Sequence, residues 1–165
     1  MLPLTLLAAE KLSALLVNGN ALSIQISAIA NSSNQTVPSI PSSQIVLSSA
    51  TPDIGDKNLQ FTYPRVCLYS IGLKNTHIEK FRSLSGTVSV IADIWVSANL
   101  LQDADNWSHF YVEALTNILR LSIGDWGDGV FFSGAYDVQF QPAKAGGFGF
   151  VELAKVTCNV NVSRN

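Results

Sequence analysis

Two pairs of residues have types and spacing that would suit metal binding or catalysis. Asp125 and Asp128 stand among glycines in GDWGDG (124–129), and neighbouring carboxylates can ligate a divalent cation. His109 and Glu113 are four residues apart, so on a helix they share a face and could hold a metal or pass a proton. Together the four residues would suit a small metal-dependent hydrolase. Neither pair is completed by further ligands at the usual spacing, so we favour a tight turn at 124–129 and a solvated or interfacial face for the second pair.

The other reactive or glycine-rich features also have simpler interpretations. PAKAGGFGF (142–150) lacks the Gly-Lys-Ser/Thr order of a phosphate loop, and we interpret it as a hairpin tip that presents Lys144 and Phe148 to an interface. Cys67 and Cys158 lie in apolar runs without metal-ligand neighbours, which predicts buried free thiols. The sequence therefore predicts no catalytic residue, no cofactor and no metal site.

The composition indicates a protein whose surface carries little charge. Of 165 residues, 47% are hydrophobic and 13% are charged, about half the usual charged share. Ten basic and twelve acidic residues give a net charge of -2, which disfavours nucleic acid as the main ligand. From Leu12 to Thr51 there is no charge at all. Much of the surface must be neutral and polar, or covered by partners.

The N-terminal third combines an apolar helix with an uncharged extension. Pro3 and the leucine spacing after it predict a helix that Asn18 and Gly19 end. Glu10 and Lys11 interrupt its apolar run, so we expect packing against protein and not a membrane span. The alternation over 22–28 predicts a strand, 31–52 an extended excursion, and 44–47 a second short strand.

The remainder predicts strands around one amphipathic helix. Strands are expected at 61–72, 87–97, 130–141 and 154–162, and a helix over 107–119 with Asp103 or Asp105 as N-cap and Gly124 near its end. In each of the last three strands one face is apolar, while the other carries mainly Thr, Ser, Asn and Gln. The fold class is therefore α+β, an antiparallel sheet with helices on one face.

A basic patch lies between the first two of these strands. It consists of Lys74, Lys80 and Arg82, and it is either a solvated turn or a contact with an acidic neighbour.

A series of motifs resembles the tail-terminator, or tail-completion, proteins of long-tailed bacteriophages. The motifs occur in order over the last two thirds of the chain: YPRVCLYS (63–70), EKFRSLSGTVSVIADIWVSA (79–98), YVEALTNIL (111–119), GDWGDGVFFSGAYDVQFQP (124–142) and KAGGFGFVELAKVTCNVNVS (144–163). The resemblance implies a tail-terminator-like core at 61–165. Residues 1–60 would add a helix and an uncharged segment that serves as an interface or clamp, in one structural domain overall.

The resemblance also implies a function in the virion. The chain would form a homo-oligomeric ring, typically hexameric, on top of the tail tube, where it ends tube growth and joins tail to head. Its partners would be the tail tube protein and a neck, head-completion or adaptor protein, with genomic DNA only in transit and no membrane. The protein would be assembled in the host cytoplasm. The alternatives are another neck component, a free monomeric binding module, and the hydrolase described above.

Two sets of residues follow for such a ring. The expected interface residues are Lys74, Lys80, Arg82, Lys144 and Phe148, and the expected channel lining is Gln139, Gln141, Thr157, Asn159 and Asn161. A lining of this kind carries little fixed positive charge, so phosphates would slide past it without being held.

Overall fold

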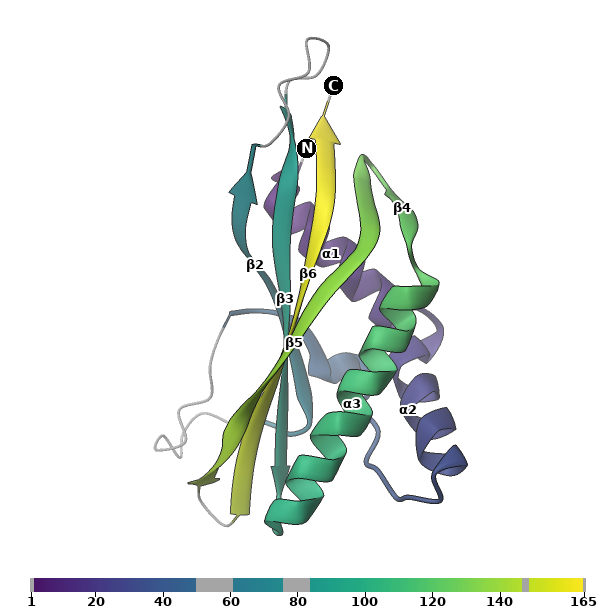
Figure 1. The fold of residues 1–165 in the computed structure, drawn as a ribbon, viewed down its shortest axis with the longest axis vertical. Helices are drawn as coiled ribbons and strands as arrows, with labels where there is room; N and C mark the ends of the chain where they lie inside the picture. Colours follow the sequence, from purple (N-terminus) through teal and green to yellow (C-terminus); the bar gives the residue numbers. More distant parts are fainter. Residues whose placement is uncertain (1, 50–60, 76–83, 147–148, 165) are drawn as a thin grey trace.

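The chain forms a six-stranded sheet whose helices all lie on one side (Figure 1), as seen in a computed structural model that describes residues 2–49, 61–75, 84–146 and 149–164. The helices within these ranges are α1 (Leu4–Val17), α2 (Ala21–Ser32) and α3 (Leu101–Leu121), with short 3-10 turns at Asn18–Asn20 and Ser42–Gln44. The strands are β1 (Ile45–Leu47), β2 (Arg65–Lys74), β3 (Leu84–Ala98), β4 (Gly124–Gly127), β5 (Val130–Gly146) and β6 (Gly149–Arg164). The predicted α+β class is confirmed.

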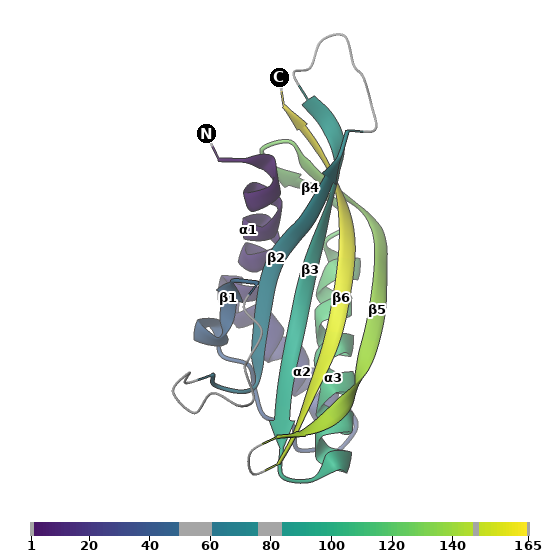
Figure 2. The same cartoon turned by 90° about the vertical axis from the view of Figure 1, so that its left-hand side faces the viewer.

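The strand order is β1-β2-β3-β6-β5-β4, and all neighbours are antiparallel except β1 and β2. The sheet is therefore mixed, which corrects the expectation of a purely antiparallel one. Parallel neighbours need a long connection, and the 17 residues between Leu47 and Arg65 are enough for it. Figure 2 shows β2, β3, β6 and β5 side by side, with α2 and α3 behind them and α1 beside β2.

Alternation along the long strands separates a core face from an outer face, as predicted. On β3 the side chains of Val88, Val90, Ala92, Ile94 and Val96 join the core, and on β6 those of Ala154, Val156, Cys158, Val160 and Val162 do so. Successive side chains of a strand point to opposite faces, so the residues between them belong to the outer face. The helices supply the other half of this core, including Leu12, Leu16, Leu22, Ile26, Leu115 and Leu119.

The predicted first helix is confirmed, but the expected strand at 22–28 is wrong, because these residues belong to α2. Leu22, Ile26 and Ala30 are buried at helical spacing, whereas Ile24, which the strand would have placed with them, is exposed. The combined stretch Leu4–Ser32 is long and apolar enough to cross a membrane by length and composition. It is broken by positive φ angles at Gly19 and Asn20 into helices of 14 and 12 residues, each shorter than the roughly 20 residues that a span needs.

The amphipathic helix α3 is confirmed and is longer than predicted. It begins at Leu101, after Leu100 as N-cap, so Asp103 lies inside the first turn and neither predicted aspartate caps the helix. An acidic side chain in the first turn still interacts favourably with the helix dipole. Ser122, two residues before the expected Gly124, is the C-cap.

The stretch GDWGDG forms the first strand and the turn of a hairpin whose second strand is β5. Gly124–Gly127 is the edge strand β4, which the sequence did not predict, and Asp128 and Gly129 make the turn with φ angles of 55° and 78°. Two successive positive φ angles are typical of a two-residue hairpin turn, for which Asp-Gly is a preferred pair. Trp126 packs on Phe132 of β5, with ring centroids 5.2 Å apart, and anchors the hairpin to the core.

The described part of the uncharged excursion folds back on its own chain. Ile40 is buried in the core, and the Tyr111 hydroxyl of α3 donates a hydrogen bond of 2.8 Å to the carbonyl oxygen of Pro38. The short strand expected at 44–47 is confirmed as β1. The N-terminal third and the sheet therefore share one core, while the clamp role stays a prediction.

Candidate functional site

The five predicted channel residues lie on the outer face of β5 and β6. Thr157, Asn159 and Asn161 alternate with the buried residues of β6. Gln139 and Gln141 of β5 are exposed and pair with Lys155 and Leu153, which belong to the same face. The structure therefore brings the five together on one surface, as the alternation predicted.

Hydroxyl and amide side chains on this face bond to one another across strands. Ser89 donates a hydrogen bond of 2.7 Å to Oδ1 of Asn159, and Thr87 donates one of 3.3 Å to Oδ1 of Asn161. β3 and β6 are antiparallel and in register over this stretch, so each pair of residues faces directly across the strands. The result is a row of four neutral polar side chains. It is flanked by Asp137 of β5, which pairs with Thr157, and by Lys74 of β2, which pairs with Thr87.

Asp93 and Lys155, further along this face, form an ion pair that the sequence did not predict. Asp93 is 4% exposed; its Oδ2 accepts a hydrogen bond of 2.8 Å from the Tyr69 hydroxyl, and its Oδ1 lies 3.6 Å from Nζ of Lys155. Burial, and then the hydrogen bond to Asp93, raises the pKa of Tyr69 above its usual range, so the phenol keeps its proton. The sequence shows only a single Asp in one alternating strand, Asp93, and a single Lys in another, Lys155. It is the register of β3 and β6 that brings the two together.

An aromatic cluster at the start of β2 makes the outer face less polar than predicted. Arg65 lies over the ring of Phe61 at 4.5 Å, and Phe61 contacts Tyr63 and Trp95 at centroid distances of 5.0 and 6.2 Å. Ile91 and Leu153, also on this face, are only 4% and 7% exposed. The neutral polar row therefore covers part of the face only, next to an apolar and aromatic part.

The described members of the predicted interface set lie far apart. Lys74 is exposed at the end of β2 and pairs with Thr87, whereas Lys144 is exposed on β5 and pairs with Val151, the partner of Ser97. Thr87 and Ser97 are ten residues apart on β3, about 33 Å along a strand. Lys80, Arg82 and Phe148 lie outside the described residues. Any contacts at Lys74 and Lys144 would thus occur at opposite ends of the sheet.

The four residues of the hydrolase alternative do not converge. His109 lies in the first half of α3 with its ring 4.3 Å from that of Phe140, while Glu113 is 3.6 Å from Arg120. Asp125 accepts a hydrogen bond from the Gly127 amide, and Asp128 is 2.6 Å from Lys11. His109 is twelve residues from the end of α3, roughly 18 Å along the helix axis. Over the described ranges no group of three or more His, Cys, Asp or Glu side chains could hold a metal ion.

Both cysteines are buried free thiols, as predicted, and they lie on opposite faces of the sheet. Cys158 belongs to the core, whereas Cys67 pairs with Asp93 and so faces outward. Burial raises the pKa of Cys158 to about 12. Burial is also the main cause that raises the pKa of Cys67, and the nearby Arg65 partly opposes it.

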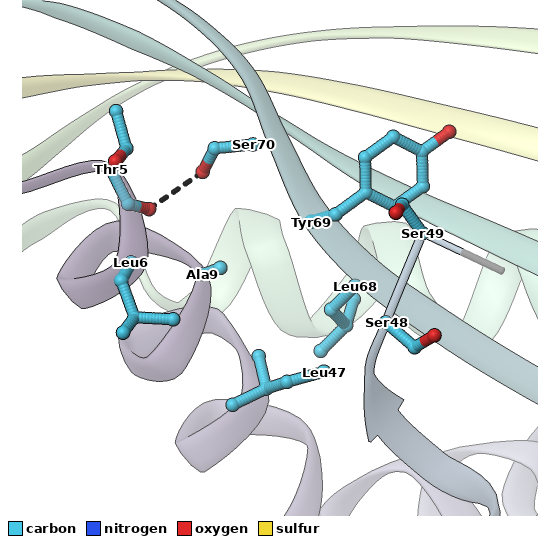
Figure 3. Close-up of a pocket in the computed structure, with 9 residues that line it drawn as sticks. All are labelled: Thr5, Leu6, Ala9, Leu47, Ser48, Ser49, Leu68, Tyr69 and Ser70. Carbon is cyan, nitrogen blue, oxygen red and sulfur yellow. Dashed lines mark hydrogen bonds between the residues drawn. The ribbon is translucent and has the colours of Figure 1, made fainter.

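Two grooves flank α1. The first, the β2 groove, has a volume of about 360 Å³ and is lined by Thr5, Leu6, Ala9, Leu47, Ser48, Ser49, Leu68, Tyr69 and Ser70 (Figure 3). The second, the α3 groove, has a volume of about 500 Å³ and lies between α1, the end of α3 and β4. Leu121 and Ile123 line the α3 groove and are 79% and 56% exposed. Large apolar side chains that stay exposed beside a groove are typical of surfaces that partners cover.

Comparison with models of known protein families gives no match, and comparison with curated proteins gives none. The function must therefore be argued from the residues of this chain and their arrangement.

Proposed function

We propose that the chain is a structural protein of a bacteriophage particle. It forms a homo-oligomeric ring, hexameric in the form that the resemblance implies, at the top of the tail tube. There it ends tube growth and joins the tail to a neck, head-completion or adaptor protein. The ring leaves a channel for DNA, performs no catalysis, and is assembled in the host cytoplasm before it becomes part of the virion.

The neutral polar row on the outer face is the observation that carries this proposal. A surface in brief contact with DNA needs hydration without a fixed positive charge, because each lysine or arginine beside a phosphate adds to binding. Thr87, Ser89, Asn159 and Asn161 satisfy one another, and Lys155 is balanced by Asp93. The ordered series of sequence motifs supports the same assignment.

The apolar grooves beside α1 support assembly with other chains. A monomer in water would gain little from leaving Leu121 and Ile123 exposed at one groove, and Leu6 and Leu47 at the other. Copies of the chain, the tail tube protein and the neck protein are the partners that such a ring would meet. A neck component other than the terminator fits the same surfaces, and it would contact the portal and form a ring of different stoichiometry.

Assembly is the measurement that decides between these functions. We expect the purified protein to form a closed ring in native mass spectrometry, alone or on tail tubes from particles that lack their terminator. Tubes capped by the ring should stop growing at a defined length. A protein that stays monomeric at high concentration and leaves tube growth unchanged would contradict the proposal. Bound metal together with an activity that is lost in Asp125→Ala would favour the hydrolase.

A further inference from the structure

A carboxylic acid lies on the core face of the sheet, where apolar side chains are the rule. Glu152 of β6 is 5% exposed, pairs with Val96 of β3, and precedes Ala154 on the same face. An ionised carboxylate in such a place is costly unless donors or a cation compensate its charge. Its surroundings therefore decide its protonation state.

Among the described residues, Glu152 has one hydrogen-bond donor for its two oxygens. The Ser108 hydroxyl of α3 is 2.8 Å from Oε1, and it is also 2.8 Å from the carbonyl oxygen of Asp105. A hydroxyl carries one proton, so these two acceptors compete for it. Oε2 of Glu152 is buried and meets no hydrogen-bond donor in the described part of the chain.

A second carboxyl lies close to that of Glu152. The carboxyl of Asp105, on the exposed side of the same turn of α3, is within hydrogen-bonding reach of Glu152. Two carboxylates are both acceptors, and they cannot bond to each other unless one of them holds a proton. A proton held by one member of the pair would allow that bond to form.

The elements packed around the pair supply no compensating cation among the described residues. β3 presents Val96 and Ile94 on this face, and the bulge of β5 near Glu152 holds Pro142. α2, which packs on α3, contains no charged residue. On α3 the nearby titratable groups are Asp103 in the first turn and His109, whose ring lies against Phe140. No ion pair links either carboxyl to a basic side chain of the described ranges.

We propose that Glu152 and Asp105 form a proton-operated clasp between β6 and the first turns of α3. In the closed state the two carboxyls share one proton and the Ser108 hydroxyl completes the link. When the proton leaves, two negative charges repel each other at a buried site, and the start of α3 loosens from the sheet. Asp105 gives the site access to solvent, through which the proton exchanges.

The direction of the pH dependence follows from the pKa of Glu152, the buried member of the pair. Burial, and then Asp105, raises the pKa of Glu152 from 4.5 to about 7, although the bond from Ser108 opposes this rise. Between these values the folded chain holds a proton that the unfolded chain has lost, so stability falls as pH increases. The contribution of the clasp is fully present below about pH 4.5 and is lost as the pH rises through about 7.

Hydrogen exchange at the start of α3 tests the clasp. We expect the protection factors of the 104–108 amides, corrected for intrinsic rates, to fall by at least about tenfold from pH 5 to pH 8, since each unit of pKa shift is a factor of ten. In Glu152→Gln the amide accepts from Ser108 and donates to Asp105 permanently, so protection should be high at both pH values. Glu113→Gln, at an exposed carboxyl of the same helix, should behave as the wild type.

Two further measurements keep the proposal testable should the Gln variant not fold. The Glu152 carboxyl carbon, followed by NMR in the wild-type protein, should titrate near pH 7, and titration near 4.5 would overturn the clasp. Calcium or magnesium at pH 8 should leave the wild-type melting temperature unchanged. An increase would show that the pair binds a cation, and would overturn the shared proton.

Discussion

At the scale of single residues, the outer face holds an ion pair with a buried member. Asp93 is buried yet accepts from Tyr69 and lies near Lys155, so its charge is balanced where it stands. The neighbouring Cys67 is buried on the same face, although it is not part of the main core. Cys67 is therefore shielded from solvent although it lies on the outer side of the sheet.

The two thiols give a prediction at this scale. At pH 8, DTNB should react with neither cysteine of the folded protein within minutes, and with both once the protein is denatured. A pKa of about 12 lowers the thiolate fraction of Cys158 about a thousandfold relative to a thiol at 9.0, in addition to steric protection. One rapidly reacting thiol in the folded protein would contradict the burial of that cysteine, and Cys67→Ser would show which of the two reacts.

The polar members of the site could be predicted from sequence, but their neighbours could not. Strict alternation over 154–162 placed Thr157 and Asn159 on one face, because the side-chain period of a strand is two. The contact of Asp93 with Lys155 joins residues 62 positions apart, and it depends on the register of β3 and β6. No local pattern contains that register.

At the scale of elements, the β4–β5 hairpin depends on a glycine at a sterically closed position. Gly129 has a φ of 78°, and a Cβ there would lie 2.3 Å from the backbone oxygen of Ser163. The Gly129 carbonyl also accepts a hydrogen bond of 2.9 Å from the Ser163 amide, so the hairpin and the end of β6 are tied together. Lys11 and Asp128 add an ion pair between α1 and the turn, although Asp128 is largely exposed and the pair contributes little.

Gly129→Ala should therefore lower the free energy of unfolding by more than about 1 kcal/mol. A residue with a Cβ is strained at this positive φ, and the Cβ would clash with the backbone oxygen of Ser163. Gly72→Ala is the matched control, because a Cβ at Gly72 meets nothing within 4 Å. We expect the control to stay within about 0.5 kcal/mol of the wild type. Urea unfolding of the wild type and of the two variants measures these free energies. Equal stabilities for the two variants would refute the role of Gly129.

The elements show why one part of the fold was mispredicted. Leu22, Ile24, Ile26 and Ala28 alternate like a strand, yet the set that becomes buried is Leu22, Ile26 and Ala30. Over these seven positions Leu22 and Ile26 fit both the period of two of a strand and the spacing of a helix, and packing against the core selects the helix. β4 was missed because four residues with glycine at both ends carry no alternation, and its pairing with β5 is decided by the turn.

At the scale of the whole molecule, the sheet separates two kinds of surface. The helix-covered side holds the core and the two grooves beside α1, whereas the other side carries the neutral polar row. The proposed ring would bind other proteins at its periphery and let DNA pass through its centre, so it needs both kinds of surface. For the ring proposed above, we therefore expect the outer face to point inward and the helices to be free for contacts.

Adding positive charge to the polar row tests that orientation. Gln139→Lys with Asn159→Lys should slow DNA ejection several-fold, because lysines that line the bore would hold passing phosphates in every subunit. Gln102→Lys with Asn106→Lys adds the same charge at exposed positions of α3 and should eject at the wild-type rate. The rate of DNA ejection is measured on separate preparations of particles, one for each variant, that have incorporated the same amount of the protein. If assembled particles of the first variant eject as fast as the wild type, the outer face does not line the channel, and the helix-covered side becomes the face to examine.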